Sequence, residues 1–246
     1  MSSSTATLSD LTQRIAQFVA GRFAGASFDA AVSTATARLA AAQPILARET
    51  LQPLVAKVRN ALAAARVDSG APLALAMIAG TALGADPQIR DDAAIIAASL
   101  ASPEWAEPAD RATTEAVAVG RELTARIGAS LVLDPGWDRS GVLARFCAVA
   151  AFARLRRLAP EAVANALGLA ATEASGLGVA TASEAGAVLM GQAAADAVAA
   201  VDLAAAGFTS SLAPIEGRRG FAALLGTAFD ENAILDELGV RWTSTL

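Results

Sequence analysis

Two short clusters of charged residues carry side chains that could act on a small molecule. Asp138 and Arg139 stand together in VLDPGWDRSG, a segment whose Pro and Gly predict a loop, and Asp91 and Asp92 stand at the predicted start of a helix. A carboxylate can serve as a general base, and an arginine can hold a carboxylate through two parallel hydrogen bonds. These four residues are therefore our candidates for binding a small carboxylate. Each pair also has a structural interpretation. Asp138 and Arg139 are then a capping pair before the next helix, and Asp91 and Asp92 compensate the dipole of the helix that they begin.

A third charged cluster lies in the segment IEGRRGF, which carries Glu216, Arg218 and Arg219. The two arginines could bind an anion. In the structural interpretation, Glu216 is a carboxylate at the start of a helix, and the arginines pair with it or with a neighbouring helix.

The residues that the chain lacks restrict its chemistry. There is no His and no Tyr, and Cys147 is the only Cys. A transition-metal site would need carboxylates alone, so we predict no bound metal. Cys147 lies in the apolar stretch VLARFCAVAAF with no His to activate it, and we interpret it as a core residue. The Gly-rich stretch ASGLGVATASEAG does not follow a strand, so we predict no dinucleotide and no other cofactor.

Composition excludes several classes of partner. The net charge is −5 and no basic patch is evident, so nucleic-acid binding is not expected. The mean hydropathy of +0.47 comes largely from Ala, and the longest uncharged run is interrupted by Gly and Pro, so we expect no membrane span. The N-terminus MSSSTATLSD has neither a basic region nor an apolar region typical of a secretory signal, which favours a cytoplasmic location.

The elements that must position the charged clusters are predicted to be helices throughout. Apolar residues recur at three- and four-residue spacing, and no alternating run favours a strand. Caps and breakers divide the chain into about nine to eleven helices, which we assign to one all-α domain over residues 1–246. The second helix is expected to end near Ala42, before Pro44, and a later break is expected at Ser102-Pro103. Further expected boundaries are a start at Pro53, caps at Asp110, Ser140 and Asp230, Pro160 at a first helical position, and an end at Gly239.

Two stretches resemble a known family. AGFTSSLAPIEGRRGF is similar to the AGFTGP…LEGRRGF signature of the MmgE/PrpD family, and GWDRSGVLARFCAVAAFARL is similar to a second stretch of it. The resemblance is best over residues 136–226. It implies a helical domain that is followed in the family by a smaller α+β lid domain, with the active site between them. Family members are mostly lyases and isomerases of small polycarboxylates, such as 2-methylcitrate dehydratase, cis-aconitate decarboxylase and iminodisuccinate epimerase.

The chain departs from the family at the positions that carry its chemistry. The histidine of the family's GFHPT motif aligns with Asp138, and the lysine and histidine of its K.LH.G motif fall near Gly186 and on Leu189. The family's LDYDDTH segment reads GADPQIRDD at residues 84–92, whose aspartates stand in for the family's acids while the histidine is gone. The chain also ends where the lid is expected to begin.

These departures lead to two hypotheses about function. The first is a non-catalytic binding or partner subunit, which forms a homodimer or pairs with a separate lid-bearing MmgE/PrpD-type protein. Apolar surface that the lid would cover favours such an assembly. The second is a divergent lyase or isomerase of the dehydratase, decarboxylase or epimerase type, which acts on a small carboxylated substrate through Asp and Arg in place of His and Lys.

Overall fold

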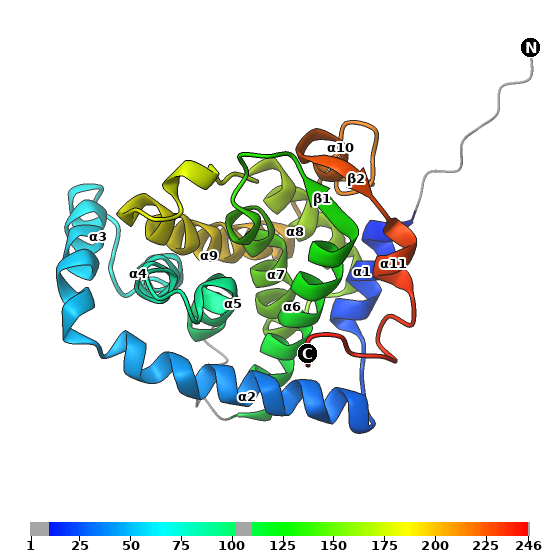
Figure 1. The fold of residues 1–246 in the computed structure, drawn as a ribbon, viewed down its shortest axis with the longest axis horizontal. Coiled ribbons are helices and arrows are strands. Elements are labelled where there is room, and N and C mark those ends of the chain that lie inside the picture. The colour runs from blue at the N-terminus through cyan, green and yellow to red at the C-terminus, as the bar shows by residue number, and fades with distance from the viewer. Residues whose placement is uncertain (1–9, 102–109, 246) are drawn as a thin grey trace, which may run out of the picture.

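Eleven α-helices form most of the described chain, residues 10–101 and 110–245 of a computed structural model (Figure 1). They are α1 (Leu11–Ala20), α2 (Ala26–Leu46), α3 (Gln52–Ala64), α4 (Pro72–Gly84), α5 (Arg90–Leu100), α6 (Arg111–Ser130), α7 (Arg139–Leu155), α8 (Pro160–Thr172), α9 (Glu184–Ala205), α10 (Phe221–Leu225) and α11 (Glu231–Leu235). Short 3₁₀ turns cover Glu49–Leu51 and Gly178–Ala180. The only sheet in this part of the chain pairs β1 (Leu131–Leu133) with β2 (Gly226–Phe229). The predicted all-α fold is confirmed.

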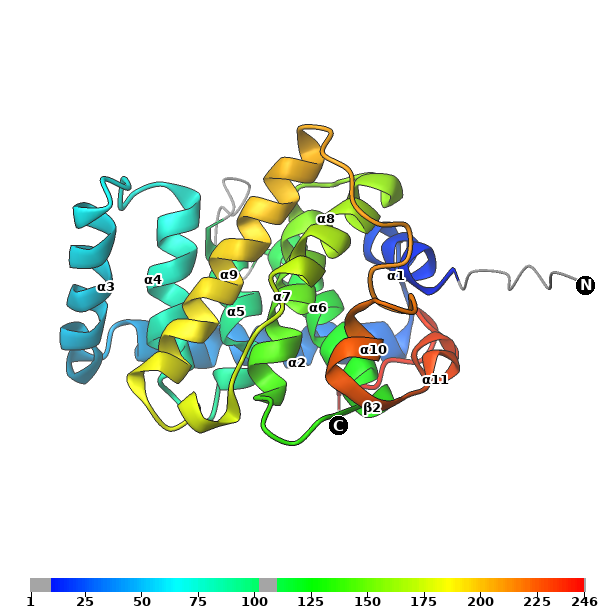
Figure 2. The same cartoon turned by 90° about the horizontal axis from the view of Figure 1, so that it is seen from above.

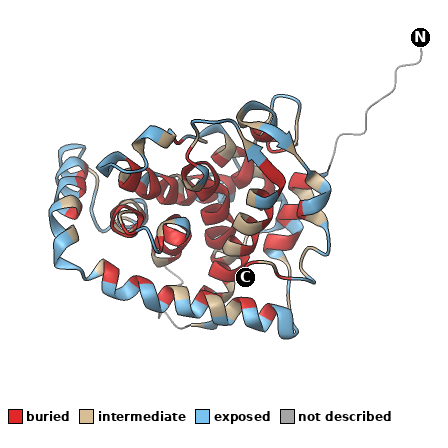
Figure 3. Cartoon of the chain, in the orientation of Figure 1, coloured by how far each residue is buried: buried red, intermediate tan, exposed pale blue. Residues whose placement is uncertain are grey.

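Helix α7 forms the centre of the core. Apart from three arginines, its sequence is almost entirely apolar or small, which is typical of a helix buried all round. It packs against α5, α6, α8 and α9, and it is buried along nearly its whole length (Figure 3). Phe146 and Phe152 are among the largest side chains that are completely buried, and the ring of Phe146 meets that of Phe221 edge-on at 4.5 Å. This contact attaches α10 to the central helix.

Glycines allow α4 and α9 to pack at very short range. A Cβ atom on Gly191 of α9 would lie 2.3 Å from Oγ1 of Thr81 and 2.4 Å from the carbonyl oxygen of Met77. A Cβ atom on Gly80 of α4 would lie 2.8 Å from the Cα atom of Gly191. The two helices therefore touch backbone to backbone, and α9 is held against the body of the protein.

Helix α9 is also long and apolar enough to cross a membrane, judged by length and composition. Within the protein, 67% of its most apolar window is buried. The close packing on Gly80 and Gly191 explains this burial. The prediction that no segment spans a membrane stays a prediction.

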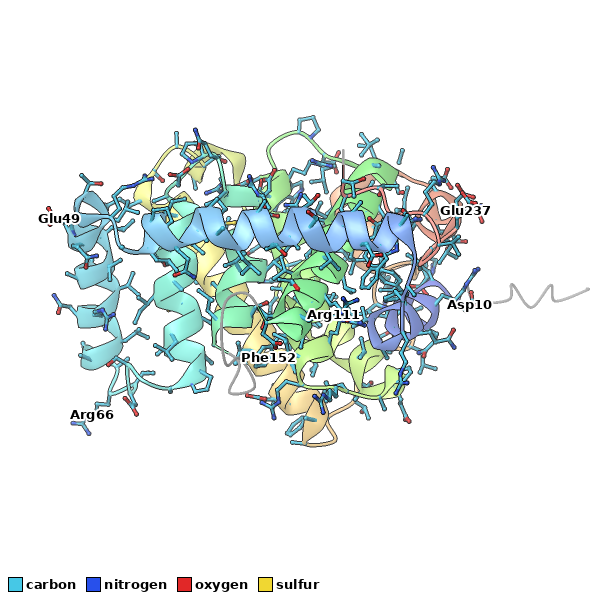
Figure 4. All side chains as sticks on the ribbon, turned by 90° about the horizontal axis from the view of Figure 1, so that it is seen from below. Asp10, Glu49, Arg66, Arg111, Phe152 and Glu237 are labelled. Atoms are coloured by element: carbon cyan, nitrogen blue, oxygen red, sulfur yellow. The ribbon has the colours of Figure 1, made fainter. Side chains whose placement is uncertain are left out.

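Helix α2 lies across one face of the other helices and links the two ends of the molecule (Figure 4). It continues through Pro44 to Leu46, so the expected end near Ala42 is wrong. Pro removes one helical hydrogen bond, but only two helical residues follow it. Ala42 and Ile45 are both buried in the core, and this burial carries the helix past the proline.

Other helix boundaries agree with the sequence to different degrees. Pro160 is the first residue of α8, and the Asp230 carboxylate accepts hydrogen bonds from two backbone N–H groups at the start of α11. Helix α7 begins at Arg139, so Asp138 and not Ser140 occupies its cap position. Helix α11 ends at Leu235, before Gly239. The break expected at Ser102-Pro103 lies outside the described residues.

A buried ion pair in α6 holds the C-terminal segment. Nε of Arg126 donates to Glu122 at 2.6 Å, and both side chains are almost completely shielded from solvent. Arg126 also donates to the carbonyl oxygens of Ile234 and Asp236, each at 2.7 Å. Glu122 accepts the backbone N–H groups of residues 243 and 244. Each charge is thus neutralised by the other and also bonded to the backbone of the segment it holds.

Candidate functional site

Three segments that are distant in sequence meet at one corner of the molecule. Arg90, the first residue of α5, joins them. Its Nη2 donates to Oδ2 of Asp138, and its Nη1 donates to the carbonyl oxygens of Gly84 at 3.2 Å and Gly186 at 2.9 Å. We call this group of four residues the Arg90 corner. It connects the end of α4 and the starts of α5, α7 and α9.

Asp138 is buried within this corner. The residue is 7% exposed, and it occupies the cap position of α7 without accepting an N–H group from the helix. Its backbone N–H donates to the carbonyl oxygen of Gly176 at 2.9 Å, and Gly178 N–H donates to Gly136 at 2.6 Å. The loop 173–183 therefore lies against the loop that precedes α7, and both loops fix the position of Asp138.

Asp92 is also buried and is bound by two arginines. Nε of Arg38 lies 2.5 Å from one carboxylate oxygen, and Nη1 of Arg121 lies 2.5 Å from both. These bonds join α2, α5 and α6. Asp86 is similarly engaged, because Arg48 donates to it at 2.9 Å. The carboxylates of Asp92 and Asp86 thus hold neighbouring segments of the fold together.

Asp91 and Arg139 lie nearer to the surface. The hydroxyl of Ser140 donates to the carboxylate of Asp91, which joins α5 to the first turn of α7. The guanidinium of Arg139 covers Gly128, where a Cβ atom would lie only 2.1 Å from Nη2. The space enclosed beside Asp91, Arg139 and Ser140 is only about 20 Å³. The structure therefore brings Asp91, Arg139 and Asp138 to one region, while Asp92 faces away to Arg38 and Arg121.

The family model of the MmgE/PrpD N-terminal domain matches residues 85–233. This chain belongs to the MmgE/PrpD family. The match covers more than half of the chain and includes the IEGRRGF segment and three of the four residues of the Arg90 corner. A comparison with curated proteins finds no match.

Three of the positions at which the MmgE/PrpD resemblance places the family's His and Lys side chains lie at or next to the Arg90 corner. Asp138 lies there, and Gly186 accepts a hydrogen bond from Arg90. Leu189 packs between two glycines, since its Cδ2 atom lies 2.4 Å from a Cβ atom built on Gly141 and 3.2 Å from one built on Gly176. An ion pair and an apolar side chain therefore occupy these positions of the fold.

Arg90 is the residue of this corner that the sequence analysis missed. The sequence does contain a signal for a paired arginine here, because the helix dipole disfavours a cation in the first turn of a helix. Arg90 is the first residue of α5 and precedes Asp91 and Asp92. An arginine in this position calls for a compensating partner, and Asp138, 48 residues further along the chain, provides the charge.

No group of three or more metal-ligating side chains of the types Cys, Asp and Glu occurs within residues 10–101 and 110–245. The predictions that no metal and no cofactor bind stay predictions. Cys147 is buried in α7, and this burial raises the pKa of its thiol to about 12. The interpretation of Cys147 as a core residue is confirmed, because its side chain is part of the buried apolar core.

The IEGRRGF segment has a different role from the Arg90 corner. The carboxylate of Glu216 accepts hydrogen bonds from the backbone N–H of Thr12 at 3.1 Å and from its hydroxyl at 2.6 Å. Glu216 is therefore a carboxylate at the start of a helix, as the structural interpretation predicted, but that helix is α1, 204 residues away in the sequence. The expected pairing of Arg218 and Arg219 is wrong for the described part of the chain, where both are exposed and neither forms an ion pair.

Proposed function

We propose that this MmgE/PrpD-family chain is a non-catalytic helical subunit that acts by binding a partner. The observation that carries the proposal is the buried pair of Arg90 and Asp138. A general base must reach the proton that it removes, within hydrogen-bond distance of the substrate. The carboxylate of Asp138 is instead directed to Arg90 and shielded from solvent.

A small space next to the Arg90 corner supports the same proposal. Small-molecule sites usually enclose about 300–1,000 Å³. The space beside Asp91, Arg139 and Ser140 is about 20 Å³, which is close to the volume of one water molecule. The side chain of Leu189 closes the neighbouring position against Gly141. The space is thus far smaller than a site for a tricarboxylate.

The partner is proposed to cover the loop 173–183, which flanks the corner. Leu177 is 61% exposed and Val179 is 90% exposed, and both are apolar. The loop is tied to the segment before α7 through Gly136 and Gly178, so these side chains are presented from a fixed backbone. Apolar side chains gathered at one place on a surface favour a protein interface. The partner is a second copy of this chain or a lid-bearing MmgE/PrpD-type protein.

Two measurements test the proposal. Purified protein is assayed for turnover of 2-methylcitrate, cis-aconitate and iminodisuccinate, and we expect none. Turnover that disappears in Asp138→Asn would instead support the divergent lyase or isomerase. Sedimentation is measured for the wild type and for Leu177→Asp combined with Val179→Asp, with Val240→Asp as a control because Val240 is equally exposed but lies near the C-terminus.

We expect a dimer that the double variant dissociates and the control preserves. If the wild type is a monomer, the proposed partner is the separate lid-bearing protein. That protein should then co-sediment with the wild type and not with the double variant. If neither a dimer nor such a complex forms, the proposed binding role is wrong.

A further inference from the structure

A cavity of about 850 Å³ lies between the second half of α8, the loop 209–220 and α10. In Figure 2 these three segments lie on the side of the molecule away from α3. The cavity shares no lining residue with the Arg90 corner or with the small space next to it. Its volume is in the range of small-molecule sites.

The walls of this cavity are largely apolar. Leu212 and Leu224 remain 76% and 67% exposed, so their side chains offer apolar surface that no described residue covers. Hydroxyl groups of Thr172, Thr209 and Ser210 add a few polar positions. No acidic side chain is among the described residues that line it. The main apolar residues are Leu169, Leu212, Pro214, Phe221, Leu224 and Leu225.

The charge in this cavity comes from Arg218 and Arg219. Both side chains are exposed, and neither pairs with a carboxylate of the described chain. The nearest carboxylate in the sequence, Glu216, is bound to Thr12 at the start of α1. Two adjacent positive charges therefore remain without compensation, on a protein whose net charge is −5.

The backbone that carries the two arginines is held in one conformation. Gly217 N–H donates to Ala213 at 3.1 Å, and Gly220 N–H donates to Gly217 at 2.7 Å. Phe221 N–H donates to Pro214 at 2.8 Å, which closes the turn. A ligand that binds here orders two side chains but no loop, so binding costs little conformational entropy.

We propose that this cavity binds an amphipathic carboxylate. The planar guanidinium groups of Arg218 and Arg219 match the two oxygens of a carboxylate. The hydrocarbon part lies on the apolar wall that includes Leu212 and Leu224. A concave, largely apolar site with few polar groups is typical of small-molecule binding. Such a shape suits a small ligand better than it suits the flat surface of a protein partner. The proposal is independent of the proposed function, because it uses no residue of the Arg90 corner.

The test uses decanoate as the probe, below its micellar concentration, with the full chain in a calorimetric titration. We expect one molecule to bind per chain. Decanol, which lacks the charge, and acetate, which lacks the chain, should each bind at least about tenfold more weakly, because each loses one of the two kinds of contact.

Variants locate the site. Arg218→Gln with Arg219→Gln should weaken decanoate binding at least about tenfold, and Leu224→Glu should do the same by placing a negative charge on the wall. The matched control is Arg59→Gln with Arg66→Gln, which removes the same charge from exposed positions on and next to α3. Arg66 points away from the protein at the far end of the molecule (Figure 4). The control should bind decanoate like the wild type.

Three results would overturn the proposal. The first is the absence of decanoate binding. The second is binding that the arginine variant and Leu224→Glu leave unchanged. The third is a dimer that Leu224→Glu dissociates and that decanoate does not, since the cavity would then be part of a protein interface. All substituted side chains are exposed, and circular dichroism verifies that each variant is folded.

Discussion

Arg90 and Asp138 form a buried ion pair that joins the start of α5 to the start of α7. The same guanidinium donates to the carbonyl oxygens of Gly84 and Gly186, so that one side chain links four helix ends. Hydrogen bonds that involve an ionised group are roughly twice as strong as neutral ones. The pair therefore makes the corner a structural joint, and this is the physical basis of the proposed loss of catalysis.

The first prediction concerns this joint. Arg90→Met should lower the free energy of unfolding by about 3–5 kcal/mol, because it leaves the Asp138 carboxylate buried without a counter-charge. The control is Lys57→Met, which breaks the exposed pair with Glu184 and should change stability little. Urea denaturation measures both. Adding Asp138→Asn to Arg90→Met should recover part of the lost stability, because the buried carboxylate is then removed. Equal losses of stability in Arg90→Met and Lys57→Met would contradict the role of Arg90 as a structural joint.

The second prediction concerns Cys147 and alkaline pH. The unfolded thiol ionises near its ordinary pKa of 9.0, whereas burial raises the pKa in the folded protein to about 12. The folded state is therefore at full stability below pH 9 and loses stability as the pH rises from 9 to 12. Few other side chains titrate in this window, because the chain has no Tyr and Lys57 is its only Lys.

Urea denaturation at pH 8 and pH 10 measures this effect. The wild type should lose about 1 kcal/mol more than Cys147→Ala between the two pH values. The same loss in both proteins would show that the Cys147 thiol does not cause it. A thiol reagent provides the second readout, and native protein should react slowly at pH 8 and rapidly once unfolded.

The third prediction concerns the C-terminal segment. Arg126→Met should release residues 234–245, because the backbone carbonyls of Ile234 and Asp236 lose their donor and Glu122 remains buried without its counter-charge. Hydrogen exchange should show faster exchange in this segment, with a stability loss of about 3–5 kcal/mol. The control is Arg241→Gln, which removes only exposed ion pairs. Unchanged protection in Arg126→Met would refute the clamp.

The fourth prediction concerns the contact between α4 and α9. Gly191→Ala should destabilise the protein by about 1–3 kcal/mol or more, because the new methyl group collides with Thr81 and with the backbone of Met77. Gly70→Ala is the matched control, since its nearest neighbour is the Asp68 side chain at 3.5 Å. Thermal unfolding followed by circular dichroism compares the two. A smaller loss for Gly191→Ala than for Gly70→Ala would contradict the close packing.

The sequence by itself determined the features that depend on neighbouring residues. Pro160 at the start of α8 and Asp230 at the start of α11 were predicted, because a first-turn proline and a capping carboxylate act within one helical turn. The helical class follows from apolar spacing, which is also local. The family membership followed from a contiguous motif around Glu216 and Arg218.

Tertiary structure decided the features that join distant parts of the chain. Glu216 meets Thr12 across 204 residues, and Arg90 meets Asp138 across 48, and no local pattern states which charges will pair. Helix α2 passes Pro44 because burial of Ala42 and Ile45 outweighs a local breaking signal. The physical reason is common to all three cases: the energy of these contacts comes from burial and charge compensation between segments, and those depend on the packed fold and not on the sequence of any single element.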